Sequence, residues 1–176
     1  MSLFVLMRFL ESAPERYDRG MHLLFRGGLE EAYQRLAERI LPGQRILDLG
    51  CGTGSFGLCA VRRGAWVKGI DRDSGMLAVA GRRIEEQGCQ ERFALQERGA
   101  AELDREESCS RDAVLAGLVF SELGADELAF TLRQVERILK PGGLLLVAEE
   151  VSARSSGLRV LHALARAPVA VLTWIL

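Results

Sequence analysis

The stretch Ile46-Leu47-Asp48-Leu49-Gly50-Cys51-Gly52-Thr53-Gly54 decides the fold of this chain. It predicts a buried strand that runs into a turn, because a short apolar run is followed by glycines at alternate positions. Glycine tolerates the positive φ angles of such a turn and leaves a bare backbone that a ligand can approach closely. Asp48 adds a carboxylate at the mouth of the turn. The pattern therefore predicts a site for a nucleotide-like ligand that carries a positive charge.

The rest of the chain alternates predicted strands with predicted helices, which indicates βαβ units and a parallel sheet. The polar segment 97–112 is predicted to be an irregular surface loop, and Lys140-Pro141-Gly142-Gly143 a tight turn. Asp73 or Ser74 can cap one helix, and Asp126 another. Strands are predicted over residues 45–49, 66–71, 92–96, 113–120 and 144–148, and helices over residues 12–25, 29–40, 55–63, 74–87 and 126–139.

Composition and charge describe an ordinary globular protein. The 176 residues suit one domain, and the net charge of -1 gives no reason to expect a nucleic-acid surface. The four cysteines lack the spacing of zinc ligands, so we expect no metal site and free thiols in a cytoplasmic protein. Residues 157–176 are mostly apolar, but charged residues and a proline interrupt them, so we expect a packed helix rather than a membrane span.

Charge separates two cofactor classes that use a glycine-rich turn. Gly52-Thr53-Gly54-Ser55-Phe56-Gly57 fits the dinucleotide fingerprint, but Asp48 would repel a pyrophosphate. S-adenosylmethionine (SAM) carries an ammonium and a sulfonium, which Asp48 would attract directly or through water. Asp71, at the end of the next predicted strand, suits the ribose hydroxyls of either class. The alternative for both aspartates is a carboxylate that only caps local N–H groups.

In combination, several segments resemble the class I SAM-dependent methyltransferases. They are residues 46–54, Gly69-Ile70-Asp71, the segment from Asp71 to Leu77, and Leu139-Lys140-Pro141-Gly142-Gly143. The resemblance implies a Rossmann-like doubly wound α/β fold, with a parallel sheet in the strand order 3-2-1-4-5 and helices on both faces. It also implies that SAM is the cofactor and S-adenosylhomocysteine (SAH) the product.

The resemblance further divides the chain into three regions. Residues 1–44 are expected to form N-terminal helices over the cofactor site, 45–150 the SAM-binding core, and 151–176 a C-terminal apolar helix of the same domain. Few residues follow Glu150, so the family's strands six and seven are expected to be absent. We therefore expect a piece of a longer protein, a natural fragment, or a homo-oligomer that covers the exposed sheet edge.

The resemblance assigns residues to the cofactor. Family members have an aspartate for the adenine amino group where this chain has Ala100, so the backbone of Ala100 and Ala101 is expected to hold the ring. Tyr17 corresponds to a tyrosine that closes over the cofactor, although a packed surface aromatic is an equal interpretation. The expected cofactor-binding residues are Tyr17, Asp48, Gly50, Cys51, Gly52, Gly54, Asp71, Arg72, Met76, Ala100, Ala101 and Leu118.

Two acidic residues are the candidates for catalysis. In this fold, residues that follow the fourth and fifth strands face the sulfonium, so Glu122 or Glu149 is expected to orient or deprotonate the acceptor. The alternative is that both are solvated strand-end acids or helix caps. Cys51 has no base partner in the sequence, so we do not expect it to act as a nucleophile.

Three functions follow from these observations. The first is a methyltransferase for a small molecule. The second is a catalytically silent SAM-binding module or a partner of a corrinoid protein, because residues 10–20 and 119–123 resemble methyltransferases that accompany corrinoid proteins. The third is an NAD-type oxidoreductase, which Asp48 disfavours.

Overall fold

The computed structural model describes residues 14–149, which belong to two compact units. Residues 14–31 belong to the first unit, which contains the helix α2 (Pro14–Phe25) and the start of α3 (Gly28–Ala37). Residues 32–149 belong to the second unit, which contains the predicted core. The predicted apolar helix of residues 151–176 lies outside the described residues.

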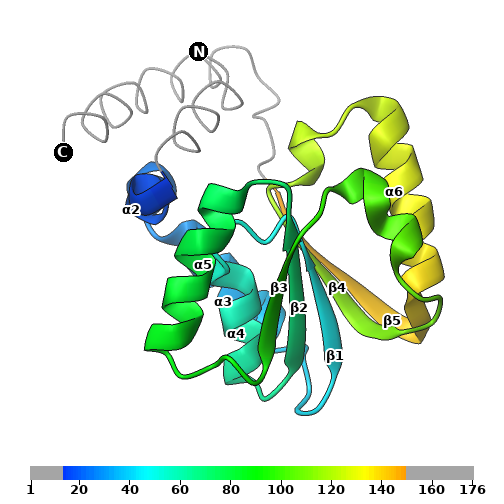
Figure 1. The fold of residues 1–176 in the computed structure, drawn as a ribbon, viewed down its shortest axis with the longest axis horizontal. Coiled ribbons are helices and arrows are strands. Elements are labelled where there is room, and N and C mark those ends of the chain that lie inside the picture. The colour runs from blue at the N-terminus through cyan, green and yellow to red at the C-terminus, as the bar shows by residue number, and fades with distance from the viewer. Residues whose placement is uncertain (1–13, 150–176) are drawn as a thin grey trace. The chain divides into compact units, whose positions relative to one another are not determined.

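The five predicted strands form one parallel sheet in the order β3-β2-β1-β4-β5 (Figure 1). This order confirms the α/β fold class. Because the strands are parallel, all their carboxyl ends lie at one edge of the sheet and all their amino ends at the other. The strands are β1 (Arg45–Leu49), β2 (Trp66–Asp71), β3 (Phe93–Glu97), β4 (Arg111–Gly117) and β5 (Leu139–Ala148).

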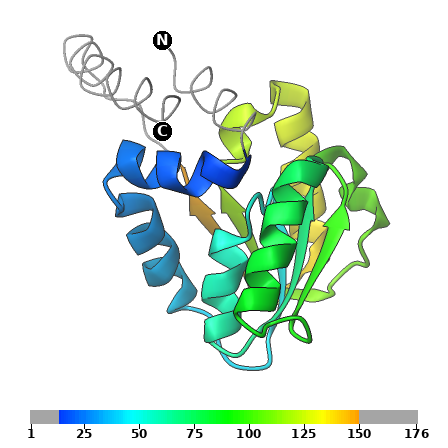
Figure 2. The ribbon, with the colours of Figure 1, turned by 60° about the vertical axis from the view of Figure 1, so that its left-hand side comes forward.

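Helices cover both faces of this sheet, as Figures 1 and 2 show. The helices α4 (Ser55–Arg62) and α5 (Ser74–Glu86) pack on one face, and α6 (Ala125–Ile138) packs on the other. The short 3-10 helices η1 (Ala100–Arg105) and η2 (Phe120–Glu122) precede and follow β4. A core between the sheet, η1 and α6 contains Leu47, Leu49, Ile70, Leu103, Val114, Val135 and Ile138.

The element boundaries differ from the predicted ones by up to five residues, and three of the differences have a local cause. The strand β4 ends at Gly117 rather than at residue 120, because Leu118 has a φ of 61°, which extended backbone does not allow. Gly124, not Asp126, is the N-cap of α6. The predicted turn of residues 140–143 is an irregular stretch within β5, where the register shifts from the pair Arg111 and Leu139 to the pair Ala113 and Leu144.

The prediction of an irregular surface loop over residues 97–112 is wrong. Residues 100–105 form η1, and Leu103 is fully buried in the core. Glu106 follows directly and is also buried, with 5% of its surface exposed. A polar sequence conceals this arrangement, because an isolated buried Leu and a buried Glu produce no periodic signal.

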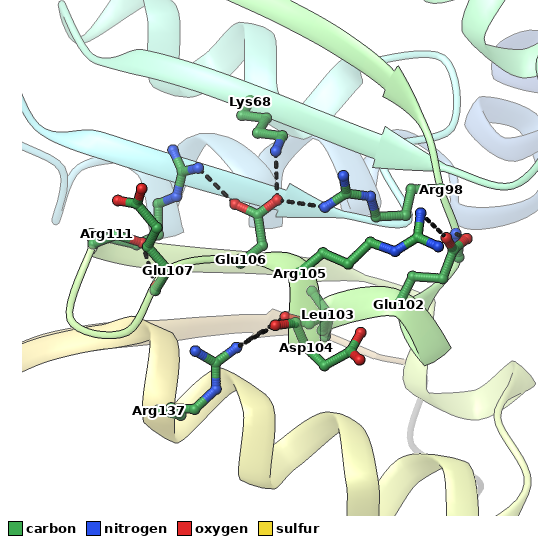
Figure 3. A network of polar contacts seen from close by, with 12 residues as sticks. Lys68, Arg98, Glu102, Leu103, Asp104, Arg105, Glu106, Glu107, Arg111 and Arg137 are labelled. Carbon is green, nitrogen blue, oxygen red and sulfur yellow. Dashed lines mark hydrogen bonds and ion pairs between the residues drawn. The ribbon is translucent and has the colours of Figure 1, made fainter.

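Three cations surround the Glu106 carboxylate, as Figure 3 shows. Its Oε1 accepts hydrogen bonds from Lys68 Nζ and from Arg98 Nη1 (2.8 Å), and its Oε2 accepts one from Arg111 Nη2 (2.7 Å). Burial alone would raise the pKa of Glu106, but the hydrogen bonds from Lys68 and Arg111 hold it below the ordinary value. This carboxylate joins β2 and β4 to the segment between β3 and β4.

We expect Glu106→Gln to lower the free energy of unfolding at pH 7 by about 3 kcal/mol, since three cations lose their shared counter-charge. The lowered pKa means that the stabilisation is present at neutral pH and is lost as the pH falls through that pKa. Urea unfolding at pH 7 and in mild acid measures both effects. Glu107→Gln, at the exposed neighbouring position, is the control. Equal losses for the two variants would contradict the prediction.

Candidate functional site

The glycine-rich turn lies at the carboxyl edge of the sheet, between β1 and α4. Gly50, Gly52 and Gly54 have φ angles of 62°, 52° and 80°. At Gly50, a Cβ atom would lie 2.6 Å from Cγ2 of Val119. A side chain here would therefore be both strained and in collision with Val119. At Gly52, by contrast, a Cβ atom would meet no heavy atom within 4 Å, so Gly52 is the position at which the turn presents open backbone.

Asp71 holds this turn from the end of β2. Its Oδ2 accepts a hydrogen bond from the Gly52 amide (2.8 Å), and its Oδ1 accepts one from the Asp73 amide (2.9 Å). Burial raises the pKa of Asp71, and these two backbone donors counteract the rise. Each carboxylate oxygen can accept more than one hydrogen bond, so the side chain keeps capacity for the hydroxyls of a ligand.

Asp48 lies beneath the turn rather than at its mouth. It is 1% exposed, and its Oδ2 accepts a hydrogen bond from the Gly57 amide (2.9 Å). Burial raises the pKa of Asp48 to about 7, against the effect of that hydrogen bond. The structure thus matches the alternative of local capping, and an additional attraction between Asp48 and a bound cation stays a prediction.

Arg83 of α5 supports the turn from the other side, and the sequence analysis missed it. Its Nη1 donates to the Thr53 carbonyl (3.0 Å), to Thr53 Oγ1 (3.1 Å) and to Ser55 Oγ (2.9 Å). Helical spacing offered a signal, because Arg83 lies seven residues after the buried Met76, on the same face of the helix. An arginine on the buried face of a helix requires a polar partner.

Arg72, predicted to bind the cofactor, and Glu122, predicted to act in catalysis, form an ion pair. Arg72 Nη2 lies 3.3 Å from Glu122 Oε2, and this ion pair links the end of β2 to η2. Because Arg72 is exposed, solvent screens the pair and limits what it adds to stability. The pair nevertheless restricts the orientation of Glu122 over the carboxyl edge.

Glu149 follows β5 and also lies beside η2. Its Oε1 accepts a hydrogen bond from the Phe120 amide (2.8 Å). Its Oε2 is buried and has no hydrogen-bond partner among residues 14–149. Burial raises the pKa of Glu149 above its ordinary value, despite the hydrogen bonds from Phe120 and Ser121. A buried carboxylate oxygen without a partner is costly in a folded protein and is a common feature of functional sites.

The remaining predicted residues lie in several elements. Cys51 is buried, and burial together with the Asp48 charge raises the pKa of its thiol, so the thiol stays protonated at neutral pH. Met76 is buried in α5, Ala100 is buried and Ala101 exposed in η1, and Leu118 is buried after β4. Tyr17 belongs to the first unit, so its closure over the site is not tested.

Within residues 14–149, no three His, Cys, Asp or Glu side chains are arranged to hold a metal ion. None of the helices in the same residues is long and apolar enough to span a membrane.

The chain is similar in sequence to the members of one protein family. Residues 46–143, more than half of the chain, match a family described as a methyltransferase domain. A protein from Thermus thermophilus named demethylmenaquinone methyltransferase is 37% identical over 145 residues, which are 80% of this chain and 63% of that protein. The chain spans about half the length of the curated relatives it matches.

Solved structures share the fold. A SAM-dependent methyltransferase from Thiobacillus denitrificans in complex with SAH matches with a TM-score of 0.57 and 25% identity, over 72% of this chain and 52% of that one. The [4+2]-cyclase SpnF matches with a TM-score of 0.63 and 26% identity, over 78% of this chain and 56% of that one.

We expect Asp48→Asn to stabilise the protein at pH 8 by about 2 kcal/mol and to change little near pH 4. The reason is that a pKa raised in the folded state makes the wild type lose stability as the pH rises from about 4 to about 7. An asparagine oxygen can still accept the Gly57 hydrogen bond. Urea unfolding of both proteins across this range measures the difference, and Asp104→Asn, at an exposed position, is the control. Parallel pH profiles would contradict the raised pKa.

Proposed function

Because the chain belongs to the class I SAM-dependent methyltransferases, we propose that it transfers the methyl group of SAM to a small molecule and releases SAH. The observation that carries this proposal is the carboxyl edge of the sheet, where a glycine turn with three positive φ angles is held by Asp71. A Cβ atom at Gly52 would meet no heavy atom within 4 Å, so a ligand can approach the backbone there, and the carboxylate oxygens of Asp71 can accept further hydrogen bonds.

Different residues of this edge would bind different parts of the cofactor. Asp71 would accept hydrogen bonds from the ribose hydroxyls. Gly52 would allow close approach of the ligand to the backbone, and Gly50 and Gly54 would give the turn the positive φ angles that it needs. Asp48 would stabilise the cationic end through its negative charge. SAM supplies an electrophilic methyl group on a sulfonium. The adenine ring would be held by Arg72, Met76, Ala100 and Ala101, and the methionine moiety would lie near Cys51 and Leu118, with Tyr17 closing the site.

Glu149 is the better placed of the two candidate catalytic residues. Its Oε2 is buried without a hydrogen-bond partner among residues 14–149, and burial raises its pKa, which makes the ionised carboxylate a stronger base toward an acceptor hydroxyl. Glu122 is held by Arg72 and would orient the acceptor instead. Positioning of the two reactants accounts for most of the rate enhancement in such a displacement, on the order of 7–11 kcal/mol.

The choice of a small-molecule acceptor is supported by the relative named for demethylmenaquinone. The alternative is a catalytically silent SAM-binding module or a partner of a corrinoid protein, and the similarity to a cyclase shows that this fold is also used outside methyl transfer. Four free cysteines support a cytoplasmic location. The edge position of β5 supports pairing with a second copy of the chain.

We expect the protein to bind SAH with a dissociation constant in the micromolar range, which corresponds to a binding free energy of about −8 kcal/mol. Asp71→Ala should weaken binding at least about tenfold, because it removes the ribose acceptors and the support of Gly52. Isothermal titration calorimetry measures both proteins, with Asp104→Ala as the control. Binding of NAD without binding of SAH would exclude the proposal.

We expect Glu149→Gln to lower methyl transfer about 100-fold while SAH affinity changes less than about twofold, because the base is lost and the cofactor contacts are not. The assay follows radiolabelled methyl groups from SAM into demethylmenaquinone and into a small-molecule extract of bacterial cells. Glu136→Gln, at an exposed position on α6, is the control. Binding of SAH without transfer to any acceptor would favour the silent module, and equal rates for both variants would exclude Glu149 as the base.

A further inference from the structure

A cavity lies at the opposite edge of the sheet from the glycine turn. It has a volume of about 450 Å³ and is lined mainly by residues at the amino ends of β1, β2, β3 and β4. Because the strands are parallel, this edge is separated from the carboxyl edge by the length of the strands. The cavity is therefore distinct from the proposed cofactor site.

The lining of this cavity is strongly basic in a chain whose net charge is -1. Arg45, Lys68, Arg92 and Arg111 line it, and Glu91 is the one acidic residue among its lining residues. Such a cluster of like charges repels itself unless counter-charges compensate. The nearby acids decide how much of the positive charge is left for a ligand.

Those acids neutralise only part of the charge. Glu106 is shared by Lys68, Arg98 and Arg111, so one negative charge faces three positive charges (Figure 3). Asp112, near Arg45, forms an ion pair with Lys140. The cluster around Glu106 thus keeps a surplus of two positive charges, although Arg98 does not line the cavity. At the cavity wall, Arg45 and Arg92 add two positive charges and Glu91 removes one.

One wall of the cavity is aromatic. Trp66 is 47% exposed, which is unusual for a tryptophan in a folded domain. The Arg92 guanidinium lies 4.8 Å from the centre of its ring, and Arg92 Nη1 donates to the Gly64 carbonyl (2.9 Å). The hydrogen bond holds Arg92 at the ring and leaves further N–H donors of this side chain for an anion.

We propose that this cavity binds a small phosphate monoester that carries a planar apolar group. The surplus of positive charge at Arg45 and Arg92 suits a dianion, since arginine pairs with phosphate through two parallel hydrogen bonds. The cavity volume exceeds the needs of a bare phosphate, and Trp66 offers a flat surface for a ring. The buried Glu106 keeps Lys68 and Arg111 in place without cancelling their charge.

Phenyl phosphate is a suitable probe because it has both groups and no adenine. Binding is measured by NMR on the whole chain, as a shift of the indole N–H resonance of Trp66 during titration. The chain has two tryptophans, and the resonance that is missing in Trp66→Phe is that of Trp66. We expect phenyl phosphate to bind more tightly than inorganic phosphate. Arg45→Gln and Arg92→Gln should each weaken it at least about tenfold, and Arg133→Gln on α6 should not. Circular dichroism establishes that each variant is folded.

Four results would overturn this inference. They are absence of a resonance shift at millimolar phenyl phosphate, equal affinity for inorganic phosphate, unchanged affinity in both arginine variants, and displacement of phenyl phosphate by saturating SAH. The experiment does not depend on the proposed methyl transfer, because a chain that fails to bind SAH can still be titrated with phenyl phosphate. The two proposals therefore fail separately.

Discussion

The hydrogen bond from the Gly52 amide to the Asp71 carboxylate is the contact on which the proposed site depends. It joins the turn after β1 to the end of β2, and the second oxygen of Asp71 fixes the start of α5 through Asp73. Asp73 in turn caps α5 by accepting from the amides of Gly75 and Met76. The half-buried carboxylate of Asp71 thereby fixes both the shape of the turn and the start of α5. Arg83, further along α5, then supports the turn by its hydrogen bonds to Thr53 and Ser55.

The parallel sheet separates two kinds of chemistry. Its carboxyl edge collects Asp48, Asp71, Glu122 and Glu149, and burial raises the pKa of three of them, Asp48, Asp71 and Glu149. Elsewhere, Lys68 of β2 and Arg111 at the amino end of β4 meet Glu106 together with Arg98, which follows β3, and the pKa of Glu106 is lowered. The pKa of a carboxylate therefore shifts in opposite directions at the two places. Glu106 has cationic partners, whereas Asp48, Asp71 and Glu149 accept hydrogen bonds mainly from backbone amides.

The sequence predicted the carboxyl edge better than the amino edge. The glycine turn and Asp71 belong to one continuous motif and a fixed spacing, which a linear chain displays directly. Arg83 makes its contacts with Thr53 and Ser55, about 30 residues away, and Glu106 needs Lys68, 38 residues away, besides the nearer Arg98 and Arg111. Arg83 was therefore not predicted to have a role, and Glu106 was predicted to lie in a surface loop. The boundary of β4 was misjudged for a different reason, because the apolar run continues past Leu118, whose φ of 61° ends the strand.

By itself, the sequence determined the order of helices and strands, the glycine turn and the family, because these depend on local periodicity and on motifs of adjacent residues. Only the tertiary structure decided which charges meet. It placed Asp48 under the turn and paired Arg72 with Glu122. It left Oε2 of Glu149 without a partner among residues 14–149, and it gathered Lys68, Arg98 and Arg111 around Glu106. The physical reason is that pKa values and ion pairs depend on distance and burial in space, and neither is encoded by position along the chain.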